Sequence, residues 1–213
     1  VVALRPDLVV LVPSVEQGDF HDRLVALGIP TARFRNIHFE EVIGNITELG
    51  ALVGRDDAAM RRVGEIRAAR RAVERAVAGK DPVRCLVVLQ HAPIFVVGAG
   101  SFLDEMVTSA GCENLARELG AGYPRASLEW VIAAAPQVIL EMSLDVDGQE
   151  VPAYWQKLSG IPAVANGRIQ QLDAELVTMP GPALDLALRE LARALHGPTI
   201  DAQIDSRLAG AGP

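Results

Sequence analysis

The sequence has few aromatic residues, and its basic residues are outnumbered by acidic ones. Aromatic side chains make up 4% of the 213 residues and apolar side chains 50%, so a core would consist mainly of Val, Leu, Ile and Ala. The 20 Lys and Arg residues face 27 Asp and Glu residues, which gives a formal net charge of -7. Because nucleic-acid binding needs clustered cations that neutralise phosphates, this balance argues against a nucleic-acid partner.

Long apolar runs are also missing. A membrane-spanning helix needs about 20 consecutive apolar residues, and the longest runs here, such as Leu8–Val12 and Trp130–Ala135, are far shorter. No leader segment is recognisable. The chain starts with Val1 in place of Met and opens directly on an apolar stretch. We therefore expect a processed or truncated N-terminus.

Motifs for metal binding and for catalysis are missing too. None of the four histidines has a second histidine or a carboxylate at the helical spacing of a metal site. A Gly-x-Ser-x-Gly nucleophile turn and a Gly-Lys-Ser/Thr phosphate loop are absent. The two cysteines, Cys85 and Cys112, are too few for a disulfide framework. Their spacing leaves open whether they pair, as an exported protein would permit.

What the sequence does contain is an alternation of short apolar runs and amphipathic segments, which is typical of an α/β fold. Strands are predicted over Leu8–Val12, Ile29–Phe34, Val83–Leu89, Gln137–Glu141 and Arg168–Leu172. Helices are predicted over Phe20–Leu27, Phe39–Val53, Asp57–Ala78, Ser101–Ala110, Leu128–Ala135, Ala153–Leu158 and Pro182–Leu195. The longest, Asp57–Ala78, has a narrow apolar stripe that indicates a strut along a surface. Two α/β units therefore flank one long helix.

Two segments are binding candidates on residue type alone. His91 ends a predicted strand, where α/β proteins usually place ligands; the alternative is an ordinary loop histidine. Gly98–Ser101 is a glycine turn before a helix, and its backbone N–H groups would suit a phosphate. The turn lacks the third glycine and the acidic residue of a dinucleotide fingerprint, so a simple entry into a helix is the competing interpretation.

Five segments, taken in order, resemble those of one known family, the substrate-binding proteins of ABC importers for cobalamin, haem and iron–siderophores. The most specific is Tyr123–Leu140, which contains Pro-x-x-Ser-x-Glu, then a helix, then Pro-Gln-Val-Ile. The other four segments are Ala3–Val9, Val97–Glu105, Gly111–Asn114 and Ile161–Ile169. In that order, they resemble the family's Leu-Lys-Pro-Asp-Leu-Val, its glycine turn and helix, its Gly-Gly-x-Asn and its Leu-Pro-Ala-Val-x-Asn-Gly-Arg-Val. The resemblance covers nearly the whole chain.

The resemblance implies an α/β fold of two Rossmann-like lobes joined by one long helix, as in class III periplasmic binding proteins. The first lobe would be incomplete at its N-terminus. We expect a partial N-terminal lobe at residues 1–54, the connecting helix at 55–80, a C-terminal lobe with a closing helix at 81–196 and a mobile tail at 197–213. A partial lobe leaves sheet edges uncovered, and a homodimer through this lobe is one way to cover them.

The resemblance also implies a function. The protein would be a periplasmic or lipid-anchored binding protein, with no enzymatic activity and no cofactor, that captures cobalamin or an iron complex such as a siderophore or haem. It would deliver this ligand to the permease of an ABC importer. Members of the family dock on permease arginines through one glutamate on each lobe, and Glu129 matches the glutamate of the second lobe. Glu129 also suits the helix N-terminus after Ser127, and the two roles are compatible.

The resemblance further suggests ligand contacts. Tyr123 matches an aromatic position that faces the cleft in cobalamin binders, where it would pack on a flat macrocycle; the alternative is a tyrosine at the rim of the lobe. Met179 stands where many relatives carry an Arg before Pro-Gly-Pro, which favours an apolar or bulky ligand over a carboxylate-rich siderophore. No metal-binding residues are expected. The predicted ligand-binding residues are His91, Ile94, Phe95, Tyr123, Glu175 and Met179.

Two alternatives remain at this point. A doubly wound α/β enzyme would use the Gly98–Ser101 turn to bind a phosphate-bearing cofactor. A truncated lobe without a ligand would show only self-association.

Overall fold

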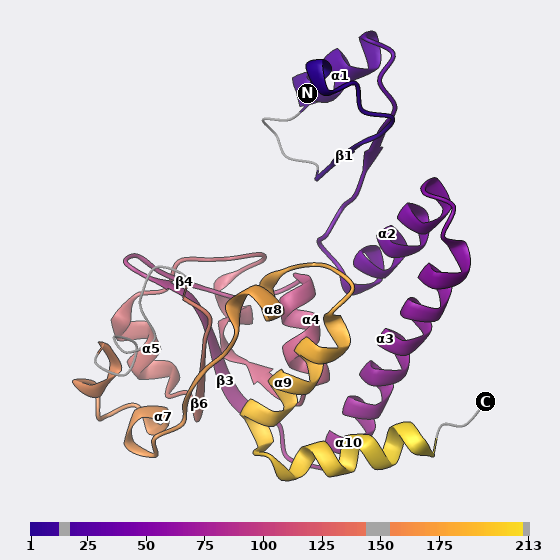
Figure 1. Cartoon of the computed structure of the whole chain (residues 1–213). Coiled ribbons are helices and arrows are strands. Elements are labelled where there is room, and N and C mark those ends of the chain that lie inside the picture. The colour runs from indigo at the N-terminus through magenta and orange to yellow at the C-terminus, as the bar shows by residue number, and fades with distance from the viewer. Residues whose placement is uncertain (13–17, 144–153, 211–213) are drawn as a thin grey trace.

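The computed structural model describes residues 1–12, 18–143 and 154–210, and its first unit is a β-α-β segment. Strands β1 (Val9–Leu11) and β2 (Thr31–Arg33) pair in parallel, and helix α1 (Gly18–Ala26) lies between them in the sequence. Parallel neighbours need such a crossover connection. In Figure 1 this indigo unit lies apart from the rest of the chain, joined to it by one extended segment.

The larger unit is built on a five-stranded sheet with the strand order β4-β3-β6-β7, in which β5 pairs with the start of β3. Strand β4 runs antiparallel to β3, and the other pairings are parallel. The central residues of β3 and β6, Cys85–Val88 and Val138–Leu140, are apolar and fully buried, as in a sheet that is covered on both sides. The strands are β3 (Val83–His91), β4 (Ile94–Val96), β5 (Cys112–Asn114), β6 (Val138–Glu141) and β7 (Ile169–Gln171).

Helices cover the two faces of this sheet and form two core clusters with it. On one face lie α2 (Phe39–Leu52), α3 (Asp56–Val77), α4 (Phe102–Ser109), α8 (Ala174–Thr178), α9 (Leu184–His196) and α10 (Thr199–Ala209). On the other face lie α5 (Leu128–Ala134) and α7 (Pro162–Ala165), as Figure 1 shows. The predicted α/β class is confirmed. The turn predicted over Ala153–Leu158 is helical at residues 154–156, and Ala153 lies outside the described residues.

Helix α3 confirms the long helix predicted over Asp57–Ala78, but its surroundings differ from those of a surface strut. Its Ile66 and Val73 are fully buried, because α2, α9 and α10 pack on it. Met60, near the start of the same helix, is 58% exposed.

Helix α2 packs with the larger unit. Its Phe39, Val42 and Ile43 belong to the same core cluster as residues of α4 and α9. At its N-terminus, the Glu105 carboxylate of α4 accepts hydrogen bonds from His38 Nδ1 (2.8 Å) and from the Phe39 backbone N–H (3.1 Å). The partial lobe at residues 1–54 and the other lobe boundaries stay predictions.

The expectation of a mobile tail from residue 197 is wrong for residues 199–209, which form helix α10. Ile200 and Ile204 are each 1% exposed and belong to the main core cluster. The turn before the helix needs Gly197, whose φ is +82°, a value that residues with a Cβ adopt at a cost. Helix α10 thereby packs against α3, and in Figure 1 it crosses the lower end of that helix.

Cys85 and Cys112 form a disulfide that joins β3 to β5. The parallel register places Cys85 beside Asn114 and Val83 beside Cys112, and the two cysteine Cα atoms are 5.7 Å apart. This separation lies within the range that a disulfide requires. The spacing in the sequence did not predict the pairing, because β5 is only three residues long.

His196 anchors the end of α9 to the turn after α4, and it makes stability depend on pH. Its Nε2 donates to the Ala110 carbonyl at 2.8 Å. Burial, together with the charges of Lys80 and Arg168, lowers the pKa of His196 below its ordinary 6.5, although the Ala110 bond opposes this shift. The unfolded chain therefore takes up a proton below pH 6.5 that the folded chain takes up only at lower pH. The contribution of His196 to stability is present above pH 6.5 and declines as the pH falls toward the lowered pKa.

Replacing His196 with Gln should reduce this pH dependence. A glutamine keeps an N–H donor for Ala110 but does not titrate. We expect the loss of stability between pH 7.5 and pH 5.5, measured by urea unfolding, to be smaller in His196→Gln than in the parent chain. Identical pH profiles for the two proteins would show that His196 does not contribute.

Candidate functional site

A buried carboxylate marks the carboxyl ends of the central strands. Glu141 is the last residue of β6, and its side chain is fully buried. Its Oε2 accepts hydrogen bonds from His91 Nε2 (3.0 Å) and Trp155 Nε1 (2.9 Å), and its Oε1 accepts one from the Ser143 hydroxyl. A buried carboxylate is costly unless it is hydrogen-bonded, so this set of donors is what keeps Glu141 at this position.

Three rings pack around that carboxylate. The Tyr154 ring stacks on His91 with centroids 4.2 Å apart and planes within 5° of parallel. Trp155 meets both rings edge-on, with centroids 5.8 Å from His91 and 4.9 Å from Tyr154. Burial and the negative charge of Glu141 raise the pKa of Tyr154, which stays protonated at neutral pH. We call Glu141, His91, Tyr154 and Trp155 the Glu141 cluster.

The interpretation of His91 as an ordinary loop histidine is therefore wrong. It is the last residue of β3, it is 7% exposed, and its Nε2 is already bonded to Glu141. Contact between His91 and a ligand stays a prediction. Its observed role is to hold Tyr154, which is only half-buried and lies at the strand ends where α/β proteins bind ligands.

Strand β4 and the segment that starts at Tyr123 lie side by side. The Val96 N–H donates to the Pro124 carbonyl (3.1 Å), and the Ala126 N–H donates to the Ile94 carbonyl (3.0 Å). This pairing brings Tyr123 and Phe95 to one edge of the sheet. Phe95 is half-buried, but Ile94 is 6% exposed and packs in the core, so the structure does not support Ile94 as a ligand contact.

Tyr123 is 46% exposed. Burial raises the pKa of Tyr123, and the Ser101 side chain opposes this shift. A neutral and partly exposed ring offers an apolar face with a polar tip. This arrangement permits the predicted role in ligand contact, which remains a prediction.

Glu175 and Met179 share a hollow of about 350 Å³ beside α8. The Asp173 side chain caps this helix by accepting from the Leu176 N–H (3.0 Å), and Glu175 lies in the first turn. Met179 follows the helix and is 60% exposed. From the long helix α3, Arg62 donates to the Pro182 carbonyl (2.9 Å) and pairs with Asp185, which fixes the loop that borders this hollow.

The Gly98–Ser101 turn does not offer a phosphate site. The N–H groups of Gly98 and Ala99 donate to the carbonyls of Gly122 and Gly120, each at 2.8 Å. The Gly100 N–H donates to the Asp104 carboxylate at 3.0 Å, so an acidic group already occupies the place of an anion. Ser101 caps α4 by accepting from the Asp104 N–H (3.2 Å), which confirms the simple turn. The phosphate-binding alternative is wrong for this turn.

Glu129 is exposed in the first turn of α5, next to the Ser127 cap. Ser127 accepts a hydrogen bond from the Trp130 N–H at 3.1 Å. The backbone N–H of Glu129 and the Ser127 hydroxyl lower the pKa of the Glu129 carboxyl, so it is ionised at neutral pH. These contacts confirm the local role at the helix terminus. They leave the carboxylate on the surface, where a partner's cation could reach it.

Comparison with known proteins identifies the family. Residues 1–176 match the family model described as "Periplasmic binding protein". The chain belongs to this family of periplasmic binding proteins. The resemblance recognised from five segments of the sequence is thereby confirmed.

The relatives of this periplasmic binding protein include vitamin B12-binding and heme-binding proteins. The vitamin B12-binding protein of Vibrio campbellii is 26% identical over 180 residues, which are 84% of this chain and 65% of that protein. A periplasmic heme-binding protein solved with two hemes is 28% identical, with a TM-score of 0.79 over 95% of this chain and 78% of that one. The apo heme-binding protein of Roseiflexus sp. RS-1 is 26% identical, with a TM-score of 0.77 over 94% of this chain and 78% of that one.

The Glu141 cluster of this periplasmic binding protein was not predicted from the sequence, in which Glu141 was only the end of a predicted strand. A signal was present, because a glutamate directly follows the buried run Val138–Leu140, where a charge needs partners. The donors lie 14 and 50 residues away, so the sequence could not name them.

Over the described part of the chain, no three His, Cys, Asp or Glu side chains gather in a way that could hold a metal ion. Nor does any described helix have the length and apolar character needed to cross a bilayer.

Proposed function

We propose that this periplasmic binding protein captures a corrinoid or an iron complex, such as haem or a siderophore, and delivers it to the permease of an ABC importer. The observation that carries the proposal is Tyr123, an aromatic side chain that is nearly half exposed where its segment pairs with β4. Phe95 lies on the adjacent strand, and Met179 is exposed beside α8. Flat macrocycles bind to apolar and aromatic surfaces with few polar groups.

The names of the relatives support this ligand class, since they bind vitamin B12 or heme. They are also named as binding proteins, which supports a role without catalysis. Because the chain spans 65% of the length of the Vibrio campbellii protein, the activity and partners of the whole protein are part of the proposal. We place the protein outside the cytoplasm, either free in the periplasm or lipid-anchored, and the Cys85–Cys112 disulfide suits an oxidising compartment.

Ligand binding is tested by titrating the chain with cyanocobalamin, haemin and NAD while recording the emission of Trp130 and Trp155. We expect quenching with cyanocobalamin or haemin at micromolar concentration and none with NAD. Tyr123→Ala should weaken binding about tenfold, because it removes a large contact face, whereas Tyr123→Phe keeps the ring and should bind nearly as the parent does. Quenching by NAD alone, or equal binding by both variants, would contradict the proposal.

Docking through Glu129 is a separate expectation. Glu129→Gln keeps the size and hydrogen-bonding capacity of the side chain but removes its charge. We expect binding to the permease, measured in proteoliposomes, to fall about tenfold, which corresponds to 1.4 kcal/mol. Affinity for the ligand should not change. Glu48→Gln, at an exposed glutamate of α2, is the matched control. Unchanged permease binding by Glu129→Gln would remove Glu129 from the docking surface.

We also propose that copies of this chain associate through the β1–α1–β2 unit. Val10 of β1 is 46% exposed, and the neighbouring Val12 and Val2 are 53% and 55% exposed. Exposed apolar side chains beside a two-stranded sheet favour pairing. Light scattering after gel filtration should give a dimer mass, and Val10→Lys should shift it toward the monomer. A monomer at all concentrations would contradict this association.

A further inference from the structure

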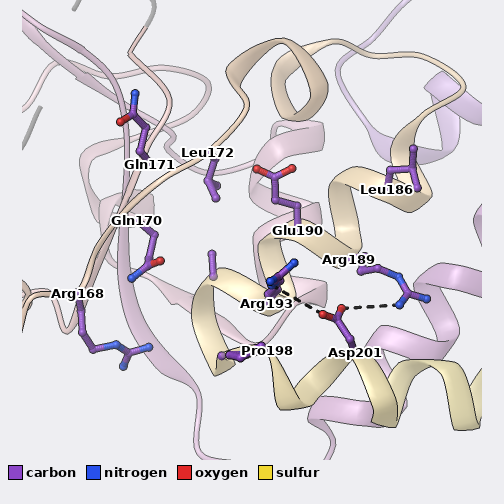
Figure 2. Close-up of a pocket in the computed structure, with 12 residues that line it drawn as sticks. Arg168, Gln170, Gln171, Leu172, Leu186, Arg189, Glu190, Arg193, Pro198 and Asp201 are labelled. Carbon is purple, nitrogen blue, oxygen red and sulfur yellow. Dashed lines mark ion pairs between the residues drawn. The ribbon is translucent and has the colours of Figure 1, made fainter. Parts of the chain in front are cut away.

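The far edge of the larger sheet carries a hollow of about 770 Å³ that none of the roles above uses. It lies between the edge strand β7 and helices α9 and α10, as Figure 2 shows. Strand β7 is at the opposite end of the sheet order from β4, which carries Phe95. The hollow is therefore separate from the predicted ligand contacts, and its volume is within the range of small-molecule sites.

The fold builds this hollow from three elements. Arg168 directly precedes β7, Gln170 lies within it, and Arg189 and Arg193 come from successive turns of α9. The turn at Gly197 directs α10 away from α9, so that Asp201 in its first turn closes the hollow from below. Positively charged arginines and the Asp201 carboxylate thereby line the same hollow.

Two of the three arginines in the hollow have guanidinium N–H groups that do not donate to a carboxylate of the described residues. Arg189 donates to Asp205 at 2.6 Å and is thus satisfied. Arg168 donates to the Leu195 carbonyl, and no carboxylate in the described parts of the chain lies within 4.0 Å of its side-chain nitrogens. Among the described residues, Asp201 is the carboxylate that pairs with Arg193, at 3.8 Å, which is too far for a hydrogen bond, and the Arg193 side chain is 63% exposed. The positive charge of Arg168 acts on its surroundings: it helps to lower the pKa of His196, to which burial is the larger contribution.

An acceptor on the opposite wall lacks a donor. Asp201 Oδ1 is buried and accepts no hydrogen bond from the described residues. The closest cation is Arg189, whose Nη1 is 3.7 Å away. The other oxygen, Oδ2, lies 3.8 Å from Arg193 Nε, and the Asp201 side chain as a whole is 29% exposed. Glu190 lines the same space and adds a second carboxylate.

We propose that this hollow binds a small zwitterion, an α-amino acid with an apolar side chain. Its carboxylate would pair with the free guanidinium donors of Arg168 and Arg193, and its ammonium group would donate to Asp201. Leu172 and Leu186 supply an apolar surface for the side chain. A simple anion would face the charges of Asp201 and Glu190, and a simple cation would face the arginines, so a ligand with both charges fits best.

The test compares three ligands of nearly equal shape by isothermal titration calorimetry at constant ionic strength. L-leucine carries both charges, 4-methylpentanoate carries only the carboxylate, and 3-methylbutylamine carries only the ammonium group. We expect L-leucine to bind and each single-charge analogue to bind at least about tenfold more weakly. Equal affinities for the three, or no heat with any of them, would overturn the proposal.

Two variants test which residues bind the carboxylate and the ammonium group of the ligand. Arg193→Gln should weaken L-leucine and 4-methylpentanoate but not 3-methylbutylamine, whereas Asp201→Asn should weaken L-leucine and 3-methylbutylamine but not 4-methylpentanoate. Arg207→Gln, at an exposed arginine near the end of α10 and outside the hollow, should bind as the parent does. If Asp201→Asn proves unstable in urea unfolding, the Nε resonances of the arginines give a second readout. L-leucine should then shift those of Arg168 and Arg193, and shifts confined to other arginines would overturn the proposal.

Discussion

Gly98→Ala should destabilise the chain by about 3 kcal/mol or more, which is a large part of the stability of an ordinary domain. A Cβ on Gly98 would lie 2.3 Å from the Gly120 carbonyl oxygen and 2.6 Å from Pro124 Cδ. Both neighbours are backbone or ring atoms and cannot rotate away. The Gly98 N–H is also bonded to the Gly122 carbonyl at 2.8 Å, so a backbone shift that relieves the clash would break this bond.

Urea unfolding followed by circular dichroism measures this effect, and Gly64→Ala is the matched control. Gly64 lies in the middle of α3, and an added Cβ meets nothing within 4 Å. The control should stabilise the protein by roughly 0.5–1 kcal/mol, because alanine has the better helix propensity. Equal urea unfolding midpoints for Gly98→Ala and Gly64→Ala would show that the close approach at Gly98 costs no stability.

Glu141→Ala is the second change with a large expected effect, about 3–5 kcal/mol of lost stability. It leaves His91, the Trp155 indole N–H and the Ser143 hydroxyl without their shared acceptor, and His91 and Trp155 are buried. Unpaired buried donors cost far more than exposed ones. Because Trp155 would lose its fixed environment, the near-ultraviolet circular dichroism should change together with the unfolding midpoint.

Two comparisons separate the cluster from general effects of losing a glutamate. Glu141→Gln keeps a carbonyl acceptor and should lose less stability than Glu141→Ala. Glu113→Ala removes an exposed carboxylate on β5, which lies 3.9 Å from Arg84, and should change stability by no more than about 0.5 kcal/mol. If Glu141→Ala unfolded at the same urea concentration as Glu113→Ala, the cluster would not be a source of stability.

Much of the fold could be predicted from the sequence, because its signals are local. The apolar runs gave β3 and β6, and the helical spacing of Leu184, Leu188 and Leu191 indicated α9, whose bounds differ by two residues from the prediction at its start. The sequence also contains an apolar spacing that is typical of a helix over α10. Ile200, Ile204 and Leu208 recur every four residues, but the polar residues between them suggested a free tail.

The site was less predictable, because its contacts link distant segments. Ile94 and Phe95 are neighbours in the sequence, but strand alternation buries the first and leaves the second half-exposed. Glu141 and His91 are 50 residues apart, and only the pairing of β6 with β3 brings them together. The disulfide depends on the register of a three-residue strand in the same way. Periodicity within one segment carries no information about such pairings.

The packing of α10 on α3 sets the order in which this core can be completed during synthesis. Ile204 enters a cluster that also contains Ile66, so α10 fills a space prepared by a helix made much earlier. Until residue 204 is available, the face of α3 that α10 covers stays exposed, and the nascent chain lacks part of its final burial. The core therefore gains its full stability only after α10 has emerged.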